Sequence, residues 1–133
     1  MRTMQPNEPD LQALMQHDAT TPVVMINLLK FKATTADGET GEAVYNRYAR
    51  NAAALVAEVG GRLLWQGRAD HLIVGGPEDR WDRVLLVEYP NRAAFALMLQ
   101  LPEFATVQGD RQAALEETVL IAATTERSLL HDT

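Results

Sequence analysis

The chain has 133 residues, 47% of them hydrophobic, and no cysteine, which fits one domain with its own core and excludes disulfides, thiolate metal sites and a cysteine nucleophile. The net charge of −6 argues against nonspecific nucleic-acid binding, because neutralising phosphates requires clustered Lys and Arg. No apolar stretch approaches the roughly 20 residues of a membrane helix, and Met1–Pro6 lacks a signal-peptide pattern, so we expect a cytoplasmic protein that binds neither nucleic acid nor membrane.

The first predicted element is a short helix over residues 6–18, where Leu11, Leu14 and Met15 form an apolar stripe at helical spacing. We interpret residues 1–133 as a single domain. Within it, residues 1–21 form an N-terminal helical extension and residues 125–133 a C-terminal tail.

Residues 22–31 form an almost continuously apolar run, which predicts a strand buried on both faces. One polar side chain, Asn27, lies in its middle. A buried amide needs partners, because leaving it unpaired costs roughly 1–3 kcal/mol. Asn27 therefore either specifies the packing or belongs to a site. The polar residues 32–41 that follow predict a loop, either a connector or a mobile lid.

The remaining elements alternate between helix and strand. Helices are predicted over residues 42–59, ended by Gly60, and over 92–101, capped by Asn91. Residues 103–117 hold one or two further helical turns. Strands are predicted over the ranges 61–68 (with 69–74 as an extension past a bend), 80–89 and 118–124.

The order β-α-β-β-α-β after an N-terminal helix is the ferredoxin-like pattern of the α+β class. It predicts a four-stranded antiparallel sheet whose central strands are the first and the third, with both helices on one face. The strands carry apolar residues on both faces; in the first, Ile26 and Leu28 oppose Met25 and Leu29. Because a whole exposed apolar face exceeds what monomers tolerate, we expect a homodimer through the sheet face.

Five segments stand out as a set: Pro22–Phe31, Gly60–Arg62, Trp81–Val84, Glu88–Pro90 and Arg111–Thr118. In this order they resemble a bacterial family of domains of unknown function, over residues 22–123. That family is similar to the dimeric α/β-barrel superfamily, which includes cofactor-free monooxygenases, haem-degrading enzymes, chlorite dismutases and muconolactone isomerases. The resemblance implies a dimeric α/β barrel but no single activity.

Asn27 and Tyr48 are the first two candidate ligand-binding residues. The Asn27 amide could donate to a substrate carbonyl or oxyanion, or could be satisfied by backbone. Tyr48 lies on the core-facing stripe of its helix, where its hydroxyl could face the sheet or simply pack in the core. Trp65 and Tyr89 are further aromatic candidates. Trp65 is interpreted as a core or interface residue rather than as one that stacks on a ligand.

Glu88 and Arg111 complete the predicted site. Glu88 could meet Asn27 on one sheet face and act as a general base, or pair with Arg62 or Arg83. Arg111 could bind an anionic substrate group bidentately, or form a salt bridge within or between subunits.

The histidines predict no metal site, because His17, His71 and His131 form no i, i+3 or i, i+4 pair. The chain also lacks nucleotide-binding motifs, so we expect no cofactor; His71 as a haem ligand is the alternative. The predicted function is binding of a small hydrophobic ligand between sheet and helices. The alternative is a cofactor-independent monooxygenase- or isomerase-type enzyme for a small aromatic or lactone-like substrate, which the fold cannot distinguish.

Overall fold

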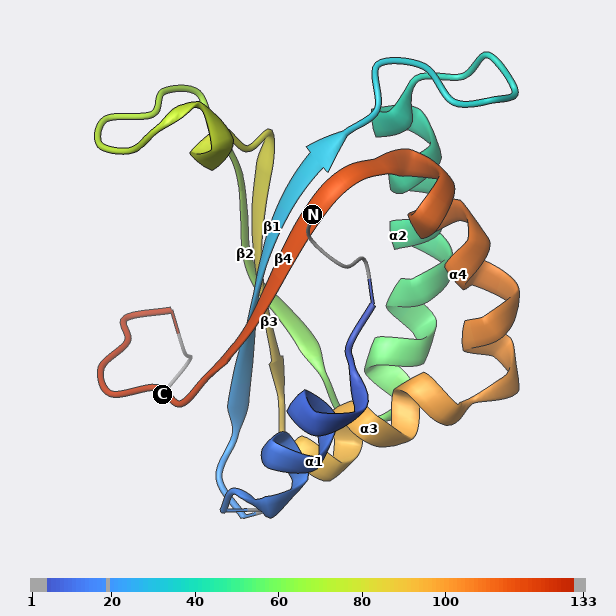
Figure 1. The fold of residues 1–133 in the computed structure, drawn as a ribbon. Coiled ribbons are helices and arrows are strands. Elements are labelled where there is room, and N and C mark those ends of the chain that lie inside the picture. Colours follow the sequence, from blue (N-terminus) through green and yellow to red (C-terminus); the bar gives the residue numbers. More distant parts are fainter. Residues whose placement is uncertain (1–4, 19, 131–133) are drawn as a thin grey trace.

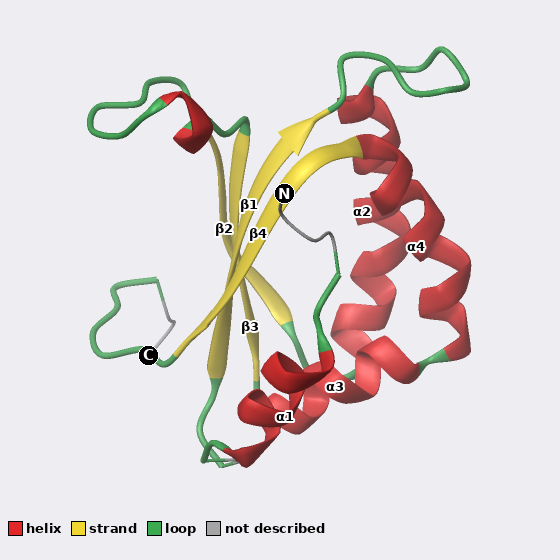
Figure 2. Cartoon of the chain, in the orientation of Figure 1, coloured by secondary structure: helices red, strands yellow, loops and turns green. Residues whose placement is uncertain are grey.

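The computed structural model describes residues 5–18 and 20–130, which form a four-stranded antiparallel sheet with helices against one face (Figures 1 and 2). The strands are β1 (Val23–Phe31), β2 (Arg62–Arg68), β3 (Arg83–Tyr89) and β4 (Leu115–Ala123). The helices are α1 (Glu8–Gln16), α2 (Gly41–Glu58), α3 (Arg92–Gln100) and α4 (Pro102–Ala114). The sheet order β2-β3-β1-β4 puts β1 and β3 in the centre, so the predicted ferredoxin-like α+β fold is confirmed.

Polar side chains start three of the helices. Asn7, Thr40 and Asn91 each accept a hydrogen bond from the backbone N–H three residues later, which satisfies a donor that the first helical turn leaves unpaired. Gly60 ends α2 in the left-handed conformation, with φ of +85°. The capping roles predicted for Asn91 and Gly60 are therefore confirmed.

Two boundaries differ from the expectation. Residues 69–74 do not extend β2, because β3 begins only at Arg83 and leaves them without a neighbouring strand to pair with. They belong to the loop 69–82, which contains a short 3₁₀ helix at Pro77–Asp79. The helix α4 is longer than one or two turns, since its 13 residues pack along α2. The last strand accordingly begins at Leu115 rather than at Thr118.

The core lies between the sheet and the helices as two hydrophobic clusters. The first gathers around α3, and β1 contributes Val23 and Met25 to it. The second gathers around the first turns of α2 and the end of α4, and β1 contributes Leu29 to it. Asn27 lies between these two contributions on the same strand face. The two clusters thus leave a gap above the middle of β1.

The opposite face of the sheet is called the outer face here, and the described helices leave it uncovered (Figure 1). The residues that the register places on it in β1, β3 and β4 are mainly apolar: Val24, Ile26, Leu28, Val84, Leu86, Val119 and Ile121. Ile121 is 47% exposed. The loop 69–82 and the residues after β4 both project on this side of the sheet (Figure 1). Within the described residues, no helix has the length and apolarity that a membrane span requires.

Candidate functional site

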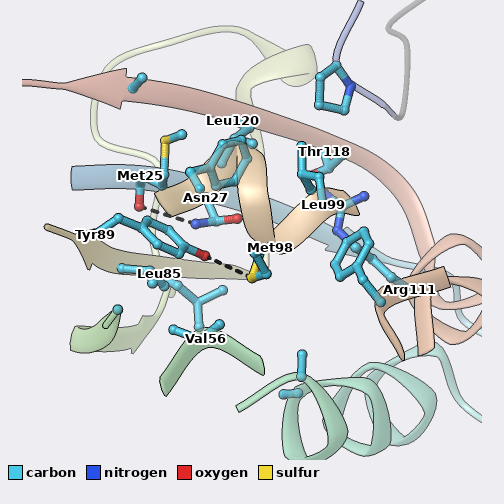
Figure 3. A pocket seen from close by; sticks show the side chains of 18 of the residues that line it. Met25, Asn27, Val56, Leu85, Tyr89, Met98, Leu99, Arg111, Thr118 and Leu120 are labelled. Atoms are coloured by element: carbon cyan, nitrogen blue, oxygen red, sulfur yellow. Dashed lines mark hydrogen bonds between the residues drawn. The ribbon is translucent and has the colours of Figure 1, made fainter. Parts of the chain in front are cut away.

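A cavity of about 1020 Å³ fills the gap between the helix-facing side of the sheet and the helices. This volume lies at the upper end of the roughly 300–1,000 Å³ typical of small-molecule sites. The lining is mostly apolar and aromatic, and Figure 3 shows Met25, Val56, Leu85, Leu99 and Leu120 around the central space. The cavity therefore has the size and the apolar walls of a ligand site.

Asn27 lies at the centre of the sheet wall of this cavity. Its strand neighbours are Leu85 on one side and Leu120 on the other, so the amide is surrounded by apolar side chains (Figure 3). The Nδ2 group donates to the backbone oxygen of Met25 at 3.2 Å. Among the described residues, none donates a hydrogen bond to Oδ1. The side chain thus offers an acceptor, and its second N–H, to a ligand.

Tyr48 comes from the covering helix α2 and lines the same cavity, as does Tyr45 one turn before it. Their ring centroids are 5.3 Å apart. Burial raises the pKa of both phenols above the ordinary value, so both hydroxyls stay protonated at neutral pH. Tyr45 was not among the predicted site residues, although its i, i+3 spacing from Tyr48 places the two on one helix face.

Arg111, in the last turn of α4, also lines the cavity. Its positive charge lowers the pKa of the Tyr45 and Tyr48 phenols. Burial has the opposite and larger effect on both pKa values. Thr118 of β4 lines the wall as well, but its hydroxyl is used by the fold, since Oγ1 donates to the Leu28 carbonyl oxygen at 3.0 Å. Asn27, Tyr48 and Arg111 are thus brought to one cavity.

Glu88 does not join them. Its neighbour on β1 is Val24, so the strand alternation directs it to the outer face, away from Asn27. There Arg62 Nε lies 3.4 Å from Glu88 Oε1. The expected meeting of Glu88 with Asn27 on one face is wrong. Asn27 pairs with Leu85, and Glu88 lies three residues further along β3, so its side chain is on the opposite face.

The other aromatic candidates divide between the two faces. Tyr89 lines the cavity, and its hydroxyl approaches the Met98 sulfur at 3.5 Å (Figure 3). Trp65 lies on the outer side, where its ring packs over Gly67 and leaves the residue 45% exposed. His71 is exposed in the loop 69–82. Within the described ranges, no three His, Asp or Glu side chains gather in a way that could hold a metal ion.

The family model described as a domain of unknown function, DUF1330, matches residues 38–125. The matched region contains four of the five segments noted in the sequence, and Pro22–Phe31 precedes it. None of the curated proteins matches the chain.

Three solved structures illustrate what the chain is similar to. A protein of unknown function from Rhodopseudomonas palustris is 29% identical, with a TM-score of 0.87 and coverage of 94% of this chain and 98% of that one. A dimeric protein of unknown function with a ferredoxin-like fold from Bacteroides fragilis is 17% identical, with a TM-score of 0.54 and coverages of 81% and 100%. SnoaB, a cofactor-independent oxygenase from Streptomyces nogalater, is 17% identical, with a TM-score of 0.53 and coverages of 82% and 97%.

Proposed function

The chain belongs to the DUF1330 family of domains of unknown function, and from this premise we propose that it binds a small hydrophobic ligand in the cavity between sheet and helices. The observation that carries the proposal is the position of Asn27. Leu85 and Leu120 flank the amide on the cavity wall, and among the described residues no group donates to its Oδ1, so this acceptor is open to a partner in the cavity. A ligand with a hydroxyl or N–H group supplies that partner.

The shape of the core supports the same function. A larger apolar residue at position 27 could have filled the space between the two hydrophobic clusters, yet the space above β1 is open. Empty space of this kind lowers stability, because the side chains around it lose packing contacts. A bound apolar molecule would restore those contacts and stabilise the folded state in proportion to its affinity.

The test uses N-phenyl-1-naphthylamine, a neutral apolar probe whose fluorescence rises in a nonpolar site. We expect saturable binding to the purified protein. Ala49→Phe places a ring in the cavity and should weaken probe binding about tenfold or more. Ala54→Phe, on an exposed position of the same helix, is the matched control and should bind like the original chain. No saturable binding, or equal binding by both variants, would contradict the proposal.

The alternative function is a cofactor-independent enzyme of the monooxygenase or isomerase type, acting on a small aromatic or lactone-like molecule. It is favoured by the convergence of the Asn27 amide and the Tyr48 phenol on one apolar cavity, where an amide N–H stabilises a developing oxyanion more strongly than in water. SnoaB provides an oxygenase example of the fold. Turnover of small phenols or enol lactones under oxygen would support this alternative, provided that Asn27→Ala removes it.

We also propose that the protein is a homodimer through the outer face. The apolar residues Ile26, Leu86 and Ile121 are adjacent across three strands there, and burying such a face needs a partner of similar shape. The loop 69–82, which contains the exposed Ile73 and Val74, projects on the same side and could contact a second copy. Sedimentation should give twice the chain mass. A stable monomer at micromolar concentration would contradict this arrangement.

A further inference from the structure

We propose that the ligand of the cavity carries a carbonyl oxygen, as in a ketone, an ester or a lactone, and that the hydroxyls of Tyr45 and Tyr48 donate hydrogen bonds to it. This inference rests on the proposed function, because it names the chemistry of the molecule that the cavity takes. The two tyrosines lie one turn apart on α2, and both line the cavity.

The hydroxyls of both tyrosines are open to the cavity. Among the described residues, none forms a hydrogen bond with either hydroxyl. Only two side-chain oxygens of these residues are both buried and unpaired, namely Oγ1 of Thr21 and Oγ1 of Thr35. The hydroxyls of Tyr45 and Tyr48 are therefore not enclosed by packed side chains, although Tyr45 as a whole is only 5% exposed. The open space that both side chains line is the cavity.

The third tyrosine of the cavity already has a partner. The Tyr89 hydroxyl donates to the Met98 sulfur at 3.5 Å, as the dashed line in Figure 3 shows. Such pairing is the rule for buried tyrosines, because taking an O–H group out of water without a partner is unfavourable. Two unpaired hydroxyls on one wall of an apolar cavity are therefore suited to a ligand atom that accepts from them.

The geometry of the pair suits a single acceptor oxygen. The ring centroids of Tyr45 and Tyr48 are 5.3 Å apart. Two O–H···O hydrogen bonds of about 2.7 Å each can meet at one oxygen when their donors are up to about 5.4 Å apart. A carbonyl oxygen has two lone pairs and can accept both bonds at once. Both phenols keep their protons at neutral pH, because burial raises the pKa of each.

The neighbours of the pair indicate what else the ligand carries. Tyr45 packs in one hydrophobic cluster with Leu29 and Leu85. Leu85 is the neighbour of Asn27 across β1 and β3, and both side chains face the same space in Figure 3. One small molecule can therefore place its carbonyl on the two phenols and a hydroxyl or N–H group on Asn27. The net charge of −6 repels anions at long range, which favours a ketone, ester or lactone over a carboxylate.

The test compares two naphthalene probes in variants that lose only hydroxyls. One is 6-propionyl-2-(dimethylamino)naphthalene, a ketone whose emission moves to longer wavelength when its carbonyl accepts a hydrogen bond; the other is N-phenyl-1-naphthylamine, which has no carbonyl. The double variant Tyr45→Phe/Tyr48→Phe should bind the ketone about tenfold more weakly or worse, the value of two neutral hydrogen bonds, and move the emission of the bound ketone to shorter wavelength. Its binding of N-phenyl-1-naphthylamine should change less than about twofold.

Tyr89→Phe is the comparison variant within the same cavity. It also removes one hydroxyl, but this hydroxyl is already paired with Met98. Binding of the ketone should therefore fall less in Tyr89→Phe than in either single variant, Tyr45→Phe or Tyr48→Phe. An equal fall in all three would mean that the ketone responds to the general polarity of the cavity, which would overturn the assignment of the carbonyl to the Tyr45 and Tyr48 pair.

The outcomes separate this inference from the proposed function. Ketone binding that is absent from the original chain, unchanged in the double variant, or lost equally with binding of N-phenyl-1-naphthylamine overturns the carbonyl ligand while the cavity proposal stands. Ketone binding that Ala49→Phe does not weaken lies outside the cavity and overturns it too. Failure of the original chain to bind N-phenyl-1-naphthylamine would overturn the proposed function itself.

Discussion

In the middle of β1, neighbouring residues reverse the usual distribution of polarity between the two faces of a sheet. On the face that the helices cover, β1 carries the polar Asn27 at its centre; on the uncovered face the adjacent residues, Ile26 and Leu28, are apolar. A chain that only needed to fold as a monomer would gain stability from the opposite choice, because apolar groups are stabilised by removal from water and amides are not. Under the two proposals, the covered face binds a ligand and the uncovered face binds a second copy of the chain.

This difference shows how one strand presents different side chains to two surfaces of the same sheet. Side chains alternate between the two faces along a strand, so adjacent residues face opposite sides: Asn27 faces the cavity, and Ile26 faces away from it. The covered face is shielded from bulk water, which strengthens polar interactions with a small molecule. The uncovered face is broad and apolar, which suits another protein surface. Substitutions on adjacent residues should accordingly separate ligand binding from dimerisation.

The largest expected effect is that of Ile26→Glu. At a two-fold interface the substitution introduces a charge on both copies, so we expect the dimer to weaken by about 4 kcal/mol, or roughly a thousandfold in the dissociation constant. Sedimentation velocity at micromolar concentration measures it. Circular dichroism should show whether the protomer keeps its secondary structure. A dimer of unchanged affinity would mean that the outer face is not the interface.

Asn27→Ala is the adjacent substitution on the other face. It should weaken binding of a ligand that bears a hydroxyl or N–H group by about three- to tenfold, the value of one neutral hydrogen bond, and leave the dimer intact. The melting temperature should change little, because the amide is tied to the fold through the single bond to Met25. If the melting temperature instead falls by about 2–8 °C while binding is kept, Asn27 has a structural role.

The fold could be predicted from the sequence because each element carries a local signal. The apolar run at Val23–Phe31 predicts its strand, Gly60 and Asn91 mark helix ends, and the element order selects the topology. Loop 69–82 could not be predicted in the same way. Its residues Leu72, Ile73 and Val74 have strand-like composition, and the lack of a partner strand is a tertiary property.

The candidate site was predictable in part. Asn27 is conspicuous as a polar residue in an apolar run, and Tyr48 lies on a regular helix face. Glu88 was assigned to the wrong side because the choice depends on the pairing register of β1 and β3, in which Glu88 faces Val24. Tyr45 carries no signal that separates a lining residue from a core residue, since both lie on the same apolar stripe.

A smaller effect, on stability, is expected where the helices α2 and α4 pack together on the helix side of the cavity. Arg47 holds Asp110 through hydrogen bonds, which lowers the pKa of that carboxyl. The ionised carboxylate thus stabilises the fold above the unfolded-state pKa of about 3.9, and this stabilisation is lost as the pH falls through the lowered folded-state pKa. Because the two side chains have relative exposures of 42% and 32%, screening by water and salt keeps the contribution small.

Asp110→Asn should therefore be less stable than the original chain at pH 7, and the difference should shrink as the pH falls below about 3.9 to pH 3. Urea unfolding at the two pH values measures both quantities. Glu116→Gln, an exposed acid on β4, is the control and should show a smaller difference at pH 7. A gap that stays constant from pH 7 to pH 3 would mean that Asp110 acts through packing rather than charge.

The smallest expected effect is that of Glu88→Gln on ligand binding. Glu88 lies on the outer face beside Arg62, and its side chain is 13% exposed. The substitution keeps the shape and removes the charge, so we expect binding of the neutral probe to change by less than about twofold, since surface pairs contribute little and the sheet separates this carboxyl from the cavity. The dimer is the more sensitive readout, because an outer-face pair is adjacent to the proposed interface. A large loss of probe binding, with the dimer unchanged, would contradict the division of roles between the two faces.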